Sequence, residues 1–108
     1  GFSVYYYGLP KNSINDWMIA KAKDKYNTVP DLFDAGGFAA AMAIVTALEK
    51  TNGSADAEKL IAAMEGMSFE TPKGKMTFRK EDHQALQTIY AIKLEKKDGF
   101  DYPVPVLV

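Results

Sequence analysis

The side chains that could do chemistry in this chain are few, and the clearest group surrounds its single histidine, His83. Glu81 and Asp82 precede it directly, and imidazole and carboxylate groups are ordinary metal ligands. Adjacent side chains diverge in direction, however, and the chain has no cysteine and no second histidine to complete a ligand set. We therefore interpret residues 80–84 as a solvated charged loop, and we predict no metal site and no cofactor.

A Gly-Gly step at Gly36 and Gly37 could open an anion-binding site at the start of a helix. A phosphate-binding loop would also need a Lys-Ser/Thr pair, whereas Phe38 and Ala39 stand there. Close packing of the backbone against a neighbouring sheet is therefore the favoured interpretation. A weaker alternative is that the free N–H groups of this helix start face a bound ligand.

Aromatic residues mark two further candidate sites. Tyr5, Tyr6 and Tyr7 could form a platform, but alternate strand residues point to opposite faces, and ordinary strand packing is favoured. Phe33 and Asp34 precede an apolar helix, in the kind of connection that often carries binding residues. From the residues alone, packing of Phe33 in a core is the favoured interpretation.

Catalytic chemistry has no positive support in the sequence. There is no readable Ser/His/Asp arrangement, no HExxH motif and no pair of carboxylates at a fixed catalytic spacing. The acidic residues fall on expected helix surfaces and turns instead. We therefore predict no catalytic residues and no enzyme activity.

The elements that would position these residues come in the order strand, three helices, then short strands, which indicates an α/β chain. The predicted strands are 2–9, 67–70, 75–79 and 87–95, the predicted helices are 12–26, 38–51 and 56–65, residues 31–34 are expected to be extended, and the tail 102–108 is extended as well. A turn at Thr71-Pro72-Lys73-Gly74 joins two of the strands. There is no regular β-α alternation and no internal repeat.

The helix expected over residues 38–48 has almost no polar face, because Thr46 is its only polar residue. A helix this apolar must be covered on most sides. The predicted strands are too few and too scattered to cover both sides of it. The sequence therefore indicates a fragment of a larger protein, or a chain that needs a partner.

Composition narrows the class of protein. The 108 residues are 47% hydrophobic and 25% charged with a net charge of −1, which is typical of a globular chain without a nucleic-acid or anionic-lipid surface. The longest apolar run is about half of the roughly 20 residues of a membrane span, so we expect no transmembrane helix. The start, GFSVYYYG, has no signal peptide, so the protein is either cytosolic or begins after its signal.

Several short segments carry a resemblance to a known family. They are Leu9-Pro10 followed by Asn15-Asp16-Trp17, residues 25–30 (KYNTVP), Phe33 with Phe38 and Ala39, residues 47–54 (ALEKTNGS), residues 69–78 (FETPKGKMTF) and Asp82-His83. Together, from about Tyr7 to Tyr90, they resemble the C-terminal part of type I periplasmic substrate-binding proteins of ABC transporters, in the branch of the leucine/isoleucine/valine-binding proteins. The sequence departs at Phe38-Ala39, where the family tends to have Tyr-Asp, and at Thr71, commonly Gly.

The resemblance implies a two-lobed fold, with crossing strands between the lobes and ligand in the cleft. Residues 1–108 would be a single C-terminal fragment of it. Residues 1–82 would supply mainly pieces of the first lobe with a hinge crossing, and residues 83–108 would be strands returning toward the second lobe. The family's cleft is lined in part by the segment before the apolar helix, which implies Phe33, and more weakly Asp34, as ligand contacts.

The resemblance also implies a function: an exported, periplasmic or extracellular, component of an ABC transporter that captures an amino acid or related organic solute. Its partners would be the solute, the permease subunits and the missing N-terminal part of the same protein, and not nucleic acid. Two alternatives stay open. One is a self-associating α/β interaction module, possible as a homo-oligomer of the fragment, and the other is a small α/β enzyme subdomain.

Overall fold

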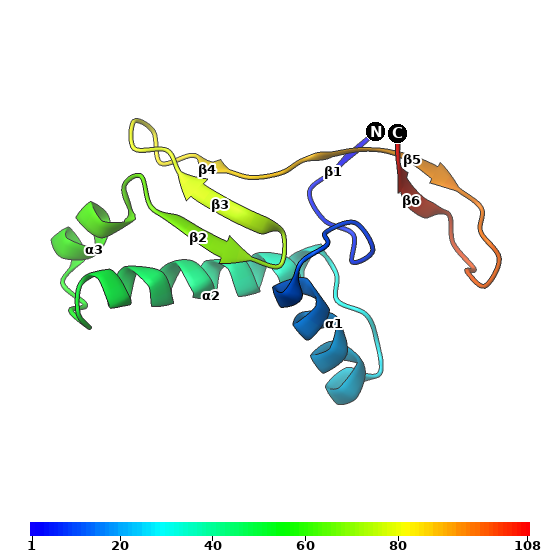
Figure 1. The fold of residues 1–108 in the computed structure, drawn as a ribbon, viewed down its shortest axis with the longest axis horizontal. Helices are drawn as coiled ribbons and strands as arrows, with labels where there is room; N and C mark the ends of the chain where they lie inside the picture. The colour runs from blue at the N-terminus through cyan, green and yellow to red at the C-terminus, as the bar shows by residue number, and fades with distance from the viewer.

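Two small antiparallel sheets of three strands each organise the chain (Figure 1). The computed structural model describes residues 1–108, with β1 (Phe2–Ser3), α1 (Ser13–Tyr26), α2 (Leu32–Lys50), α3 (Ala57–Met64), β2 (Ser68–Thr71), β3 (Gly74–Phe78), β4 (Ala85–Leu86), β5 (Tyr90–Glu95) and β6 (Val104–Leu107). One sheet has the order β2-β3-β4 and the other β1-β5-β6, and no strand belongs to both. This confirms the predicted order of a strand, three helices and short strands.

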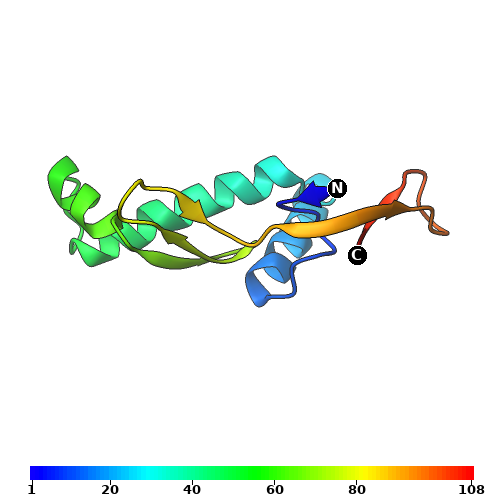
Figure 2. The same cartoon turned by 90° about the horizontal axis from the view of Figure 1, so that it is seen from above.

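Helix α2 lies along β2 and β3, as Figures 1 and 2 show from two directions. Its buried residues recur every fourth position: Ala35, Ala39, Ala43 and Ala47. Three of these alanines form the main core with Met67, Phe69 and Met76 from β2, β3 and the residue before β2. Because alanine side chains are short, the helix backbone can approach the sheet closely. The chain therefore covers one side of α2 by itself.

The other side of α2 is uncovered. Ile44 and Val45 are 56% and 47% exposed, although both are large and apolar. The chain as a whole has an accessible surface of 7193 Å², about 1,200 Å² more than the roughly 6,000 Å² expected of a compact protein of this mass. Its radius of gyration is 16.1 Å, against about 13 Å for a compact chain of this length. The expectation that the apolar helix lacks part of its cover is confirmed.

Helix α2 begins at Leu32, not near residue 38, so the expectation of an extended segment over residues 31–34 is wrong. The reason is a capping box: Asp31 accepts hydrogen bonds from the backbone N–H groups of Phe33 and Asp34, and the Asp34 carboxylate accepts one from the Asp31 N–H. By length and composition alone, α2 is also long and apolar enough to cross a membrane, a test that core helices pass as well. Its alanine stripe packs on a sheet, as in a globular lobe.

The predicted strand over residues 2–9 is only two residues long. After Ser3 the chain leaves the sheet and forms a loop, and Tyr5 turns inward against Met18 and Ala35. Asn15 draws the loop onto α1, because its side-chain amide donates to the backbone oxygens of Tyr7 and Pro10. These local hydrogen bonds replace the strand pairing that the aromatic, β-branched sequence suggests.

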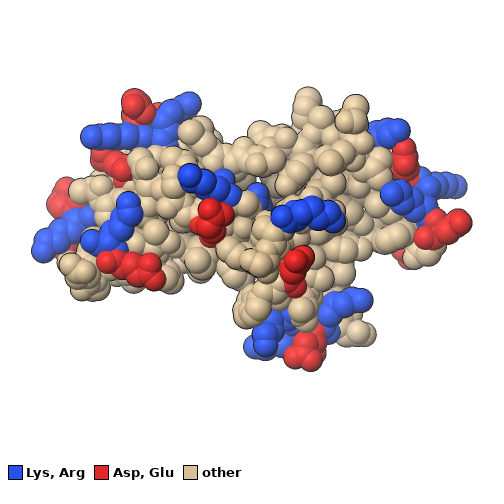
Figure 3. All heavy atoms as spheres, in the orientation of Figure 1, with Lys and Arg blue, Asp and Glu red and all other residues tan.

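Charged side chains gather at the ends of the molecule (Figure 3). In this view Lys, Arg, Asp and Glu lie over α3 and the neighbouring loops, over the far end of α1 and over the turn between β5 and β6. Several Lys, Asp and Glu side chains also lie near the centre of this face, whereas its upper part, over β1 and β5, shows few charged side chains.

Candidate functional site

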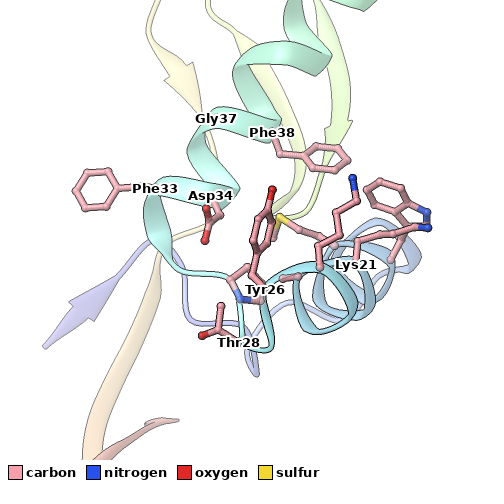
Figure 4. Close-up of a pocket in the computed structure, with 12 residues that line it drawn as sticks. Lys21, Tyr26, Thr28, Phe33, Asp34, Gly37 and Phe38 are labelled. Atoms are coloured by element: carbon pink, nitrogen blue, oxygen red, sulfur yellow. The ribbon is translucent and has the colours of Figure 1, made fainter.

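The capped start of α2 presents Phe33 to solvent. The Phe33 side chain is 83% exposed, so the interpretation that it packs in a core is wrong for this chain. Figure 4 shows its ring pointing away from α1, on the opposite side of the helix start from Phe38 and Lys21. The backbone beneath it is fixed, since the Phe33 N–H donates to Asp31 Oδ1 at 2.8 Å. A rigidly mounted, exposed aromatic ring is suited to contact an apolar group.

Asp34 lies in the same helical turn, and one of its two carboxylate oxygens already accepts a hydrogen bond. One of its oxygens, Oδ2, accepts from the Asp31 N–H at 2.9 Å. The other oxygen has no hydrogen-bond partner within the chain. The carboxylate also adds negative charge near the N-terminus of α2, where the helix dipole favours it. Asp34 therefore holds the helix start in place while keeping one oxygen available.

A groove of about 840 Å³ lies between α1 and the start of α2, and Phe33 and Asp34 are among its lining residues, although the Phe33 ring points away from α1. Its walls include Trp17, Lys21 and Tyr26 from α1 and Phe38 from α2. Trp17 and Phe38 meet edge to face with ring centroids 5.9 Å apart, and Lys21 Nζ lies 5.8 Å from the Trp17 ring. Of the α1 residues that line this groove, only Met18 is buried.

Tyr5 is buried and packs against Ala35, in the first turn of α2. Burial raises the pKa of Tyr5, and the negative charges of Asp34 and Asp31 raise it further. The phenol therefore stays protonated and donates to Asn15 Oδ1 at 2.8 Å. The sequence reading did not find this pair or the Asp31 cap. The spacing of Asp31 and Asp34, three residues apart before an apolar run, was the available signal for the cap.

Gly36 and Gly37 lie inside α2 rather than at its start, so the anion-site interpretation is wrong. Close packing against a neighbouring sheet is not found either, because a Cβ at either glycine would meet no atom within 4 Å. The N–H groups at the true helix start are also partly taken, since Asp31 accepts from two of them. The weaker alternative of a ligand at the N–H groups of Gly36 and Gly37 therefore falls with the shifted helix start.

The remaining candidate residues, the three consecutive tyrosines and His83, do not form a binding site in this structure. Tyr5 and Tyr7 contribute to a small core with Met18, while the Tyr6 ring lies against Tyr7, so the three rings form no common platform. His83 lies in an exposed loop, as predicted, with Nε2 3.7 Å from a Glu65 carboxylate oxygen.

Comparison with known proteins identifies relatives of this chain. A family model described as "Periplasmic binding protein" matches residues 1–99. The crystal structure of an ABC-type branched-chain amino acid transporter from Rhodopseudomonas palustris CGA009 is 55% identical, with a TM-score of 0.94 over 100% of this chain and 29% of that chain. An ABC transporter protein from the same species is 62% identical, with a TM-score of 0.72 over 84% of this chain and 27% of that one.

A third structure carries a ligand. The solute-binding protein of an ABC transporter from Rhodopseudomonas palustris BisB5, in complex with 3,4-dihydroxybenzoic acid, is 33% identical, with a TM-score of 0.84 over 98% of this chain and 29% of that chain. A comparison with curated protein sequences gave no match. The present chain therefore spans less than a third of the length of these structures.

The fold, three helices with two small sheets, is that of a fragment of an α/β binding protein. The chain belongs to the periplasmic binding protein family. The expected fold class is confirmed. The family comprises solute-binding proteins and not enzymes, which removes the enzyme alternative and indicates the periplasm as the location of its members.

Proposed function

We propose that this chain is part of the solute-binding component of an ABC transporter, which captures a small organic solute between two lobes and delivers it to permease subunits. Family membership and the similarity to ABC transporter proteins support this function. One similar structure is described as a branched-chain amino acid transporter, and another is a complex with 3,4-dihydroxybenzoic acid. Branched-chain amino acids and hydroxybenzoates are therefore the first solutes to test. The proposal places the protein in the periplasm, in line with its family.

The observation that carries the proposal is the 83% exposure of Phe33 on a capped helix start. A large apolar side chain held in water is costly unless a partner covers it, at about 25 cal/mol for each Å² of apolar surface. We assign Phe33 as the direct contact to the apolar part of the solute. Asp34 is the second residue of this site, with its free oxygen as a polar contact and its bound oxygen as support for the helix.

The two sheets correspond in this proposal to two lobes. The sheet β2-β3-β4 with the three helices would belong to one lobe, and the sheet β1-β5-β6 to the other. Because β4 still pairs with β3 at residues 85–86, we place the crossing at residues 87–89, slightly later than the predicted boundary after residue 82. The other crossing then follows β1, near Val4. Closure of such lobes around a ligand is a hinge motion.

The last proposed partner is the N-terminal part of the same protein. The observation behind it is the uncovered face of α2. Ile44 and Val45 lie on this face, and the similar structures are more than three times longer than this chain. We propose that the additional residues build a sheet against this face. The isolated chain then holds only one side of the cleft and binds solute weakly or not at all.

Titration calorimetry on the full-length protein tests the solute site. We expect saturable binding of either a branched-chain amino acid or a hydroxybenzoate, and Phe33→Ala should weaken it by at least tenfold. Phe2→Ala is the matched control, because Phe2 is 81% exposed and lies on β1, outside the groove that Phe33 lines. Equal losses in both variants, or no loss in Phe33→Ala, would remove Phe33 from the site.

Self-association is the second candidate function, and the same uncovered α2 face favours it. A second copy could cover Ile44 and Val45 in place of the missing lobe residues. Sedimentation of the isolated chain distinguishes the two. A folded dimer that dissociates on Ile44→Lys supports self-association, whereas a monomer or a nonspecific aggregate supports the need for the N-terminal part.

A further inference from the structure

Few contacts fix the angle between the two sheets. Within this chain they are joined by the segment 4–12 and by the crossing at residues 87–89, and no strand pairs across. Any side-chain contact between the segment 4–12 and the β5–β6 connection therefore has a large influence on their relative orientation. One such contact is present, between Tyr6 and Tyr102.

The hydroxyl oxygens of Tyr6 and Tyr102 lie 3.3 Å apart, and either can donate. Each ring is in turn held by a second aromatic ring. The Tyr6 ring centroid is 4.7 Å from that of Tyr7, and the Tyr102 centroid is 5.5 Å from that of Phe100 in an edge-on arrangement. The result is a row of four aromatic side chains that runs from the segment 4–12 to the β5–β6 connection.

The Tyr6 end of this row is anchored to the helical part of the chain. The Leu9 N–H donates to the Tyr6 backbone oxygen at 2.9 Å. The Tyr6 ring lies over Gly8, where an added Cβ would come within 3.2 Å of Tyr6 Cε1. The neighbouring Tyr5 is buried and bonded to Asn15 of α1. Tyr6 is therefore carried by the loop that α1 holds in place.

The Tyr102 end moves with the other sheet. Tyr102 lies in the connection between β5 and β6, which pair with each other over four positions. Burial and the hydrogen bonds to Tyr102 and Tyr7 raise the pKa of Tyr6. The Tyr6 phenol therefore remains a neutral hydrogen-bonding group throughout the physiological pH range.

We propose that the contact between Tyr6 and Tyr102, which we call the tyrosine bridge, is a hinge contact that favours one angle between the lobes and so sets solute affinity without touching the solute. This rests on the proposed solute-binding function. A ligand that binds only one inter-lobe arrangement has an apparent affinity scaled by the population of that arrangement. An ordinary hydrogen bond changes such a population ratio by about two- to tenfold.

The solute-binding test uses the full-length protein and a double-mutant cycle. Tyr6→Phe and Tyr102→Phe each remove one hydroxyl and keep the ring, and we expect each to change Kd by about two- to tenfold. The double variant should change Kd no further, because one lost partner already breaks the bridge. The factor should also be the same for every solute that binds, since the effect acts on closure. Additive effects, or factors that differ between solutes, overturn the proposal.

Two further variants sharpen the test. Gly8→Ala keeps both hydroxyls but crowds the Tyr6 ring, and we expect it to reproduce the change of Tyr6→Phe. Ser54→Ala removes a hydroxyl in the loop between α2 and α3, outside the groove, and should leave Kd unchanged. A Gly8→Ala protein with unchanged Kd would show that the ring position is unimportant, which contradicts the bridge.

A separate readout does not depend on solute binding. The chain has no cysteine, so spin labels at Lys75→Cys on β3 and Lys96→Cys after β5 can report the distance between the two sheets. We expect Tyr6→Phe to broaden or shift this distance distribution, and Ser54→Ala to leave it unchanged. If no solute binds but the distribution changes, the proposed function fails and the bridge stands. An unchanged distribution overturns the bridge itself.

Discussion

The hydroxyl of Tyr5 donates a hydrogen bond to Oδ1 of Asn15 over 2.8 Å, and both residues are buried. The same Asn15 side chain donates through Nδ2 to the backbone oxygens of Tyr7 and Pro10. One amide therefore satisfies three groups of the loop between β1 and α1. This arrangement ties the loop between β1 and α1 to the helical part of the chain.

Asn15→Ala should lower the free energy of unfolding by about 3 kcal/mol, because it leaves several buried polar groups without partners. Tyr5→Phe removes only the phenol hydroxyl and should cost about 1 kcal/mol. Urea denaturation of the full-length protein measures both. Ser13→Ala, in the same helical turn and with no side-chain bond to the loop, is the control. Equal midpoints for Asn15→Ala and the control would contradict the assigned role.

Asp31→Ala should destabilise the start of α2 by about 1 kcal/mol, the usual effect of losing an N-cap. Its carboxylate accepts from the N–H groups of Phe33 and Asp34, so its loss should also increase amide exchange at these two residues. Asp24→Ala, on the surface of α1, is the control. If the cap positions Phe33, Asp31→Ala should weaken solute binding as well; an unchanged Kd would separate the cap from the site.

The substitution Gly37→Ala should affect stability differently in the isolated chain and in the full-length protein. In this chain a Cβ at Gly37 meets open space, so alanine should stabilise α2 by up to about 1 kcal/mol through helix propensity. Gly37 lies on the same side of α2 as the uncovered Ile44, where we propose that the N-terminal part packs. In the full-length protein the gain should therefore be smaller or reversed. Gly36→Ala, nearer the covered side, serves as the comparison, and an equal gain in both proteins would argue against a cover at Gly37.

The loop after β3 should show a strongly acidic carboxyl group. The Arg79 guanidinium donates through Nε to Asp82 Oδ1 at 2.8 Å, and this hydrogen bond, with the Gln84 N–H, lowers the pKa of Asp82 to about 2. The charged form is thus favoured in the folded state. Its contribution to stability is complete above the ordinary pKa of 3.8 and is lost as the pH falls toward 2.

An NMR titration of the Asp82 carboxyl measures this pKa directly. Arg79→Gln should return the pKa toward its ordinary value. Arg79→Lys keeps the charge but not the two parallel hydrogen bonds, so it should give an intermediate value. Lys80→Gln is the control on the same loop. An Asp82 pKa that is insensitive to Arg79→Gln would mean that the pair does not form in solution.

Local patterns were enough to predict part of this fold from the sequence. The helix predicted over residues 12–26 corresponds to α1, which has Asn12 as its cap and ends at Tyr26, and the turn Thr71-Pro72-Lys73-Gly74 joins β2 and β3 as predicted. Both depend on residues close together in the chain. Phe33 could be singled out only through the family resemblance, because its residue type alone favours a core position. Its part in solute binding stays a prediction.

The sequence by itself determined the helix and turn signals, the family and the presence of an over-apolar helix. Only the tertiary structure decided that Tyr5 turns inward to Asn15, that alanines rather than the larger residues of α2 face the sheet, and that Phe33 stands in solvent. The physical reason is that caps and turns are satisfied by neighbouring residues, whereas burial depends on which distant segments arrive to cover a side chain. On one side of α2 that segment is the hairpin of β2 and β3, and on the other side this chain supplies none.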